Sequence, residues 1–166
     1  VAPLYPLAPM SEVVAITGFA LDFYKDFLTQ QGGKPFLMGG DSAGGGLTAA
    51  LAMAVRDAGL ILPEKLLLVC PWLAVVPGHP DQSVIEKRDA ILTIRGLREA
   101  GQMYAGAAGT GDPRVSPIHG NWEGLPPILS FGGGDDILVV DARALKAKLP
   151  SVEYHEEAGM IHDWPI

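Results

Sequence analysis

The densest glycine stretch of the chain lies between a short apolar run and an amphipathic segment, and it constrains the fold more than any other feature. Residues 36–38 are apolar, residues 39–46 read Gly-Gly-Asp-Ser-Ala-Gly-Gly-Gly, and residues 47–57 have a helical pattern. This order predicts a strand, a tight turn and a helix. The turn contains G-x-S-x-G, in which a serine stands on a sharp, strained turn. We therefore expect Gly40 and Gly44, two residues either side of Ser42, to be sterically required.

Ser42 is a candidate nucleophile because of where this turn would place it. The N-terminus of a helix directs partial positive charge and free N–H groups at whatever the serine attacks. A structural alternative is a glycine-rich turn whose serine merely caps the helix. With 21 glycines in 166 residues, the motif can arise by chance. Partner residues elsewhere in the chain must therefore distinguish the two interpretations.

Length and composition predict one ordinary packed domain over residues 1–166. The chain is 48% hydrophobic and 19% charged, which is typical of a folded globule rather than a disordered chain. A net charge of −7 and scattered Lys and Arg argue against a nucleic-acid-binding surface. No apolar run approaches the length of a membrane span. Cys70 is the single cysteine, which excludes an intramolecular disulfide and favours a core position.

Strands and helices alternate along the sequence, which predicts a doubly wound, mainly parallel sheet with flanking helices. Ser11 is the expected N-cap of the first helix, Gly32 its C-terminal stop, and Thr93 the cap of a later helix. The polar, proline-broken stretch before that helix indicates an insertion, because a simple crossover needs fewer residues. We expect strands at 1–5, 36–38, 65–70, 127–131 and 152–156, and helices at 12–31, 43–58, 94–104 and 139–149.

Three polar residues follow three of the predicted strands: Ser42, Asp136 and His162. Ligands of open parallel sheets bind beyond the carboxyl ends of the strands, so these side chains are expected to converge. Serine, acid, histidine is the chain order of hydrolase triads. His162 would take the proton of the serine hydroxyl and later return it to the leaving group. Asp136 would fix the imidazole tautomer and stabilise the imidazolium.

Other histidines and carboxylates compete for these roles. His79 and His119 lie in polar loops and are expected to be solvated. His155 lies within a predicted strand, where a core or surface role is favoured. For the acid, Asp135 is the first alternative to Asp136, and Asp141, which lies about a turn into the next helix, is the second. On the residues alone this choice stays open.

Seven segments, in this order along the chain, resemble the hormone-sensitive-lipase-like branch of the α/β-hydrolases. The resemblance implies an α/β-hydrolase fold, with Ser42 as nucleophile, His162 as base, Asp136 as the acid within D-x-L, and the backbone N–H of Ala43 as an oxyanion donor. The segments are Tyr5-Pro6-Leu7-Ala8-Pro9, Gly40-Asp41-Ser42-Ala43-Gly44-Gly45, Pro71-Trp72-Leu73, Asp112-Pro113-Arg114-Val115-Ser116-Pro117, Leu125-Pro126-Pro127, Asp136-Ile137-Leu138 and Gly159-Met160-Ile161-His162-Asp163-Trp164.

The sequence departs from the family pattern at three positions within or directly after these segments. Pro6 stands where the family usually has Arg, Met10 where it has Glu, and Ala74 where it often has Asp. The family's H-G-G-G loop, which supplies further oxyanion N–H groups, would precede Val1. We therefore expect residues 1–166 to be the catalytic core of a longer protein, with residues 76–109 as part of a cap over the acyl pocket.

By this resemblance the chain is a serine carboxylesterase acting on short- to medium-chain acyl esters, without a metal or organic cofactor. Two alternatives keep the same fold. One is a non-catalytic receptor for a small apolar ligand, and the other is an amidase or deacetylase with the same triad. The expected partner is a small-molecule acyl ester, with no nucleic acid and no membrane span. A homodimer is compatible with the sequence, and the compartment stays open, with the cytoplasm favoured.

Overall fold

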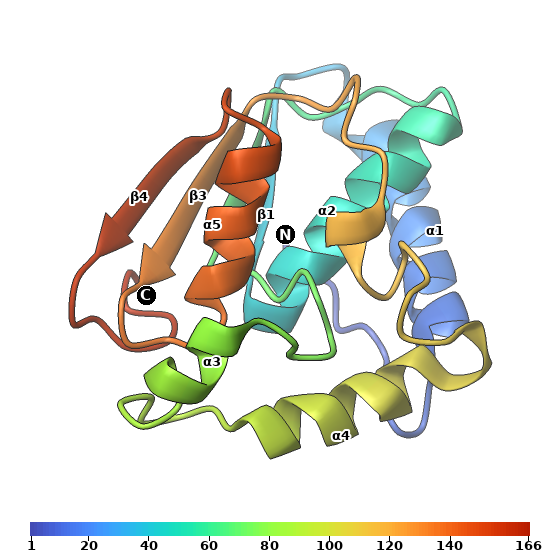
Figure 1. Ribbon diagram of the computed structural model, residues 1–166. Helices are drawn as coiled ribbons and strands as arrows, with labels where there is room; N and C mark the ends of the chain where they lie inside the picture. The colour runs from blue at the N-terminus through green and yellow to red at the C-terminus, as the bar shows by residue number, and fades with distance from the viewer.

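A computed structural model describes all residues from 1 to 166 and contains one four-stranded sheet (Figure 1). The strands are β1 (Leu37–Asp41), β2 (Lys65–Val69), β3 (Ile128–Gly133) and β4 (Glu153–Glu157), all parallel and in the order β1-β2-β3-β4. The helices are α1 (Val13–Gln31), α2 (Ser42–Asp57), α3 (Pro80–Ile85), α4 (Ile94–Ala105) and α5 (Val139–Lys148), with 3₁₀ turns η1 (Gly106–Ala108) and η2 (Pro117–His119). The predicted α/β class with a parallel sheet is confirmed.

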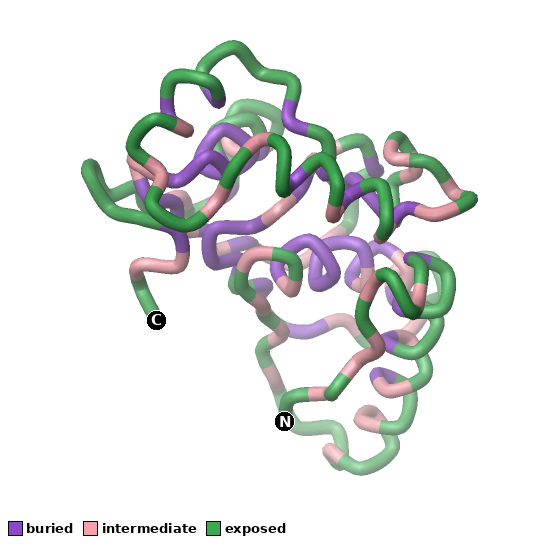
Figure 2. The backbone as a smooth tube through the Cα atoms, turned by 90° about the horizontal axis from the view of Figure 1, so that it is seen from below, coloured by how far each residue is buried: buried purple, intermediate pink, exposed green.

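The main core lies between the sheet and the two helices α2 and α5. Leu66 and Leu68 of β2 are fully buried, whereas 37% of Leu67, which points to the opposite face, is exposed. Ala49 of α2 and Leu145 of α5 belong to the same buried cluster as Leu66 and Leu68. Both helices therefore pack on one face of the sheet, and α1 packs outside α2. Figure 2 shows these buried stretches running through the middle of the molecule.

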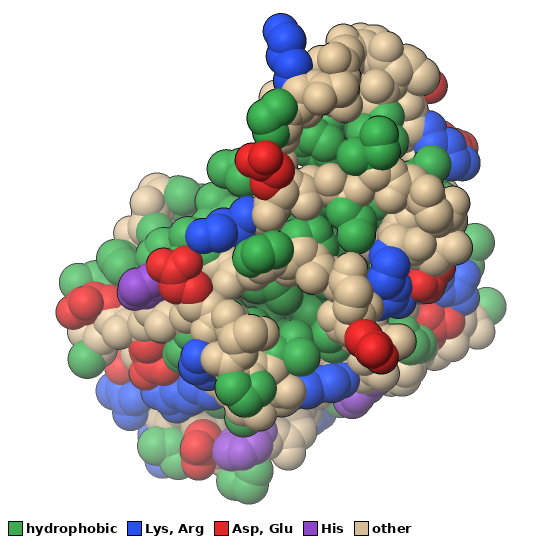
Figure 3. All heavy atoms as spheres, turned by 90° about the horizontal axis from the view of Figure 1, so that it is seen from above, with side chains coloured by type: hydrophobic (Ala, Val, Ile, Leu, Met, Phe, Trp, Pro, Cys, Tyr) green, Lys and Arg blue, Asp and Glu red, His purple; other side chains and the backbone are tan.

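The carboxyl ends of the strands all point to one side, and α3 and α4 lie beyond them at the bottom of Figure 1. The opposite side, at the amino ends, carries interspersed acidic and basic side chains (Figure 3). No helix combines the length and apolar character needed to cross a lipid bilayer. Polar residues just past the strands therefore lie on the same side of the sheet as α3 and α4.

Two sequence-based expectations about the elements are wrong, and one helix was missed. Residues 1–5 form no strand, since Pro3 removes a ladder donor and the next residue after them is Pro6. Ser11 does not cap α1: its N–H donates to the carbonyl of Leu7, and Glu12 is the N-cap residue. The short helix α3 (Pro80–Ile85) was not predicted in the polar, proline-broken stretch before α4.

A histidine cap explains why α3 forms in a segment broken by proline and glycine. His79 Nδ1 accepts a hydrogen bond from the N–H of Asp81 at 3.2 Å, and Gln82 Oε1 accepts one from the N–H of His79 at 2.9 Å. Pro80 follows as the first helical residue, where its fixed φ suits the helix. The other cap expectations are confirmed: Gly32 ends α1 with φ +69°, and Thr93 Oγ1 accepts from the N–H of Gly96.

Candidate active site

The turn between β1 and α2 has the strained geometry expected of the serine motif. Ser42, the first residue of α2, has φ +50°, a conformation that side-chain-bearing residues rarely adopt. A Cβ on Gly40 would collide with the carbonyl of Gly44, and one on Gly46 would collide with the carbonyl of Trp72. A Cβ on Gly44 would meet only Asp41 Oδ1, at 4.0 Å. The expected steric requirement for glycine is thus confirmed at Gly40 and wrong at Gly44. The second crowded position is Gly46, where α2 passes the segment after β2.

The N–H of Ala43 is a free donor beside Ser42. It belongs to the first turn of α2, whose N–H groups have no partner within the helix. The carbonyl of Ser42 accepts from the N–H of Trp72 at 2.9 Å, which fixes the turn against the segment after β2. An anion forming next to Ser42 would therefore meet this donor and the positive end of the helix dipole.

Asp136 and His162 form a buried acid–imidazole pair. Asp136 follows β3 and is fully buried, and its Oδ2 lies 3.0 Å from Nδ1 of His162. The other carboxylate oxygen, Oδ1, accepts from the N–H of Leu138 at 2.8 Å. His162, in the loop after β4, is also buried. This arrangement holds Nδ1 against a carboxylate and leaves Nε2 for other partners.

The two alternative carboxylates make different contacts. Asp135 forms an ion pair with Arg88, with 2.6 Å between Oδ1 and Nε. Asp141 Oδ2 accepts hydrogen bonds from the N–H groups of Leu73 and Ala74 at 2.9 and 2.8 Å. Burial raises the pKa of Asp141 to about 7, against the opposing effect of these two bonds. Neither carboxylate contacts His162.

The remaining histidines also lie away from this pair. His79 caps α3, and His119 is exposed in η2. His155 stacks on Phe131 with 5.5 Å between ring centroids, and its Nε2 is 3.4 Å from Oε1 of Glu153. The expectation that His79, His119 and His155 are surface or structural residues agrees with these positions.

Nε2 of His162 makes no hydrogen bond to Ser42 in this structure. It lies 3.2 Å from Oδ2 of Asp163, and Ser42 Oγ makes no hydrogen bond. Sequence analysis missed Asp163 and the neighbouring Cys70, whose Sγ accepts from the N–H of Asp163 at 3.3 Å. Both could have been found, because Asp163 directly follows His162 and Cys70 directly follows β2. The strand-end rule that selected Ser42 and Asp136 applies equally to Cys70.

The surroundings of His162 favour its protonated form. Burial is the largest influence and lowers the pKa, but the hydrogen bonds to Asp136 and Cys70 and the charges of Asp136 and Asp163 raise it to about 10. The charge of Asp163 is thus one of several influences that favour a proton on His162.

Replacing Asp163 by asparagine is expected to lower the pKa of His162, because it removes one of the charges that raise it. The base role expected for His162 from the sequence requires the deprotonated imidazole, so the ascending limb of the kcat/KM–pH profile should move to lower pH. The measurement is that profile on a p-nitrophenyl ester, with Glu157→Gln, an exposed carboxylate at the end of β4, as control. An unchanged ascending limb in Asp163→Asn would contradict the assignment of that limb to His162.

A second missed feature ties residues 88–92, which precede α4, to the loop that carries Asp136. Asp89 Oδ2 accepts from the N–H of Ile137, and its Oδ1 accepts from the N–H groups of Ile91 and Leu92, all at 2.8 Å. Arg88 holds the neighbouring Asp135. One carboxylate thus anchors the acid loop to the segment that leads into α4.

Asp89→Ala is expected to cost about 1–3 kcal/mol of unfolding free energy, because three backbone N–H groups lose a charged acceptor. Urea unfolding followed by circular dichroism measures this. Asp26→Ala removes an exposed α1 carboxylate and should change stability by less than about 0.5 kcal/mol. Equal midpoints for Asp89→Ala and the parent would show that water replaces the carboxylate without loss.

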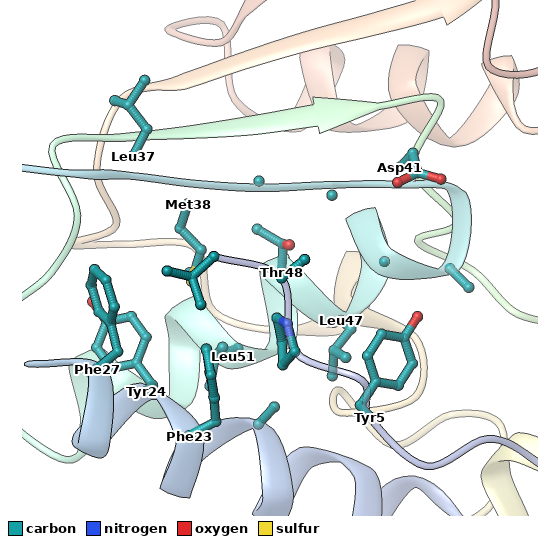
Figure 4. A pocket seen from close by; sticks show the side chains of 18 of the residues that line it. Tyr5, Phe23, Tyr24, Phe27, Leu37, Met38, Asp41, Leu47, Thr48 and Leu51 are labelled. Atoms are coloured by element: carbon teal, nitrogen blue, oxygen red, sulfur yellow. The ribbon is translucent and has the colours of Figure 1, made fainter. Parts of the chain in front are cut away.

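Two cavities border the serine turn. The larger, about 600 Å³, lies between α1, β1 and α2, and its walls include Phe23 and Phe27 of α1, Met38 of β1 and Leu51 of α2 (Figure 4). Ser42 is part of its wall. The smaller, about 230 Å³, is lined almost wholly by hydrophobic residues. Its walls include Tyr5, Ala43, Trp72, Ala100 and Tyr104. Ala100 and Tyr104 of α4 therefore share a cavity with Ala43, the residue after Ser42.

A parallel sheet with a strained serine between strand and helix, and a buried acid–imidazole pair after later strands, is the architecture of α/β hydrolases. The chain belongs to the α/β-hydrolase fold family, whose sequence model matches residues 1–166. It is 38% identical to LipR of Mycobacterium tuberculosis over 98% of this chain, and 34% identical to an acetyl-hydrolase of Streptomyces hygroscopicus over 96%. These matches cover 51% and 55% of the two relatives, so the chain spans about half their length.

Solved structures place the chain in the same branch as the sequence motifs do. A hormone-sensitive-lipase homologue from a metagenome library, EstE7, superposes with a TM-score of 0.91 at 28% identity, over 96% of this chain and 57% of that one. The esterase EstE5 gives a TM-score of 0.88 at 32% identity, over 96% and 56%. The resemblance to hormone-sensitive-lipase-like esterases is therefore confirmed.

Proposed function

We propose that this chain is the catalytic core of a serine carboxylesterase that hydrolyses short- to medium-chain acyl esters. The observation that carries the proposal is the buried Asp136–His162 pair, with 3.0 Å between Oδ2 and Nδ1, at the same edge of the sheet as the strained Ser42. Family membership supports it, as do relatives named acetyl-hydrolase and, in Acinetobacter venetianus, esterase.

In the proposed acylation, Nε2 of His162 turns from Asp163 to Ser42. Oγ of Ser42 attacks the ester carbonyl carbon while its proton passes to Nε2. The carbonyl oxygen becomes an oxyanion, to which Ala43 donates its N–H. When the oxyanion collapses, the carbon–oxygen bond to the alcohol breaks, and the alcohol leaves with the proton from Nε2. Water then repeats these steps on the acyl-enzyme and releases the acid.

A fluorophosphonate probe tests the assignment of the nucleophile. In the full-length protein the probe should form one adduct, mapped by mass spectrometry to the peptide containing Ser42. Because the probe phosphonylates an activated hydroxyl, the adduct should be lost in His162→Gln. An adduct on another serine would overturn the proposed role of Ser42, and turnover of amides rather than matched esters would favour the amidase alternative.

We further propose the 230 Å³ cavity beside Ala43 as the acyl site, and residues 76–109 as part of a cap over it. Its apolar walls suit a hydrocarbon chain, and its size suits a short one. α4 lies beyond the carboxyl ends of the strands and contributes Ala100 to the wall. The inserted segment would therefore help to set the acyl length.

Ala100→Phe is expected to fill this cavity and shift preference toward shorter acyl chains. The kcat/KM ratio of hexanoate to acetate p-nitrophenyl esters should fall by about tenfold or more, since the added ring removes space worth several methylenes. Arg98→Phe, which adds the same ring on an exposed face of α4, serves as the control. A parallel fall for both chain lengths would point to a damaged fold instead of a filled acyl site.

A further inference from the structure

We propose that Cys70, His162 and Asp163 form an inhibitory site for Zn²⁺ and chemically similar divalent cations. The inference that occupancy inhibits rests on the proposed function, because the ion would occupy the nitrogen that must take the proton of Ser42. The binding itself rests on geometry alone. The three residues come from two different strand ends: Cys70 follows β2, whereas His162 and Asp163 lie in the loop after β4.

The three donor atoms are close enough to share one ion. The sulfur, an imidazole nitrogen and a carboxylate oxygen all lie within 4.8 Å of one another, and the distance from Nε2 to Oδ2 of Asp163 is 3.2 Å. Tetrahedral zinc with bonds of 2.0–2.3 Å separates its ligands by about 3.3–3.6 Å. Closure around an ion therefore requires the donor atoms to move closer together from separations of up to 4.8 Å. A water molecule would supply the fourth ligand.

The surroundings of these atoms also match a metal site. A metal-binding histidine commonly donates its second ring N–H to a carboxylate, which is the contact between Nδ1 of His162 and Asp136. The N–H of Asp163 already points at Sγ of Cys70, at 3.3 Å, where it would stabilise a thiolate. In Asp163, Oδ1 is buried without any hydrogen-bond partner. A buried oxygen is costly to leave unpaired, and an ion held by both oxygens of this carboxylate would satisfy Oδ1 as well as Oδ2.

The donor set selects the kind of ion. Thiolate and imidazole favour zinc and similar borderline-soft cations, whereas Mg²⁺ prefers oxygen ligands in octahedral geometry. Binding replaces the proton on the thiol of Cys70 and any proton on Nε2 of His162, and both are released to solvent. An ion can reach the site from solvent at the partly exposed carboxylate of Asp163.

Isothermal titration of the full-length protein with ZnCl₂ tests the binding, and ester turnover under the same conditions tests inhibition. We expect one site, with loss of turnover tracking its occupancy, and no effect of MgCl₂ at equal concentration. Cys70→Ser and Asp163→Asn should each weaken zinc binding by about 100-fold or more, since even indirect partners of metal ligands cost 10–100-fold. Inhibition is expressed relative to each variant's own metal-free rate.

His155→Gln provides the matched control, because His155 also lies beside a carboxylate but on the surface. It should leave the zinc affinity unchanged. If Cys70→Ser does not fold, Co²⁺ titration of the parent protein still reports the thiolate through its sulfur-to-metal absorption band. Unchanged zinc affinity in Asp163→Asn, or no such band, would overturn the site. Zinc binding in a protein without esterase activity would instead overturn the proposed function and leave the site standing.

Discussion

Ser42→Ala is expected to lower kcat for an acyl ester by about 10⁶-fold, the scale seen when the nucleophile of a serine hydrolase is removed. The reason is chemical, because no other group in the turn can form the acyl-enzyme. The fold should persist, since alanine fits the space of serine and meets the same positive φ at this position. Circular dichroism and unfolding midpoints should therefore match the parent within about 0.5 kcal/mol.

Ser130→Ala is the matched control for this experiment. Ser130 lies in β3, is fully buried, and its hydroxyl has no hydrogen-bond partner. Removing that hydroxyl deletes no hydrogen bond in the structure, so turnover should stay within about twofold of the parent. A residual rate in Ser42→Ala comparable to that of Ser130→Ala would disprove the acyl-enzyme mechanism at Ser42.

Local signals were sufficient to predict the elements that carry the site. The glycine turn, the cap at Thr93 and the stop at Gly32 each depend on neighbouring residues alone, and each was predicted. The helix α3 was missed because its start depends on a histidine side chain as cap, a less common choice than Ser or Asp. The absence of a strand at residues 1–5 depends on pairing, which one segment cannot reveal.

The convergence of the site was predictable only in part. Parallel topology brings the residues after each strand to one edge, which is why Asp136 and His162 could be paired in advance. The choice between Asp136 and Asp135 depends on which way each side chain turns within one tight loop. Arg88, which holds Asp135 away, lies 47 residues earlier in an insertion whose path no local pattern fixes. The same long-range dependence hid the contacts of Cys70 and Asp163.

Asp136→Asn is expected to reduce kcat by about 10⁴-fold while leaving the loop in place. The oxygen of the asparagine amide can still accept from the N–H of Leu138, as Oδ1 does in the parent. Its NH₂ would then face Nδ1 of His162 and make that nitrogen an acceptor. The imidazole proton would move to Nε2, where it blocks removal of the proton from Ser42.

Asp135→Asn separates this effect from a general disturbance of the loop. The substitution weakens the ion pair with Arg88, which is half exposed and contributes little, so kcat should fall by less than about threefold. Steady-state kinetics of both variants on the same p-nitrophenyl ester give the comparison. If Asp135→Asn lost activity and Asp136→Asn kept it, the acid would have to be Asp135, and His162 would have to turn its Nδ1 toward the neighbouring carboxylate. The 3.0 Å contact of Asp136 with Nδ1 and the engagement of Asp135 by Arg88 predict the opposite order.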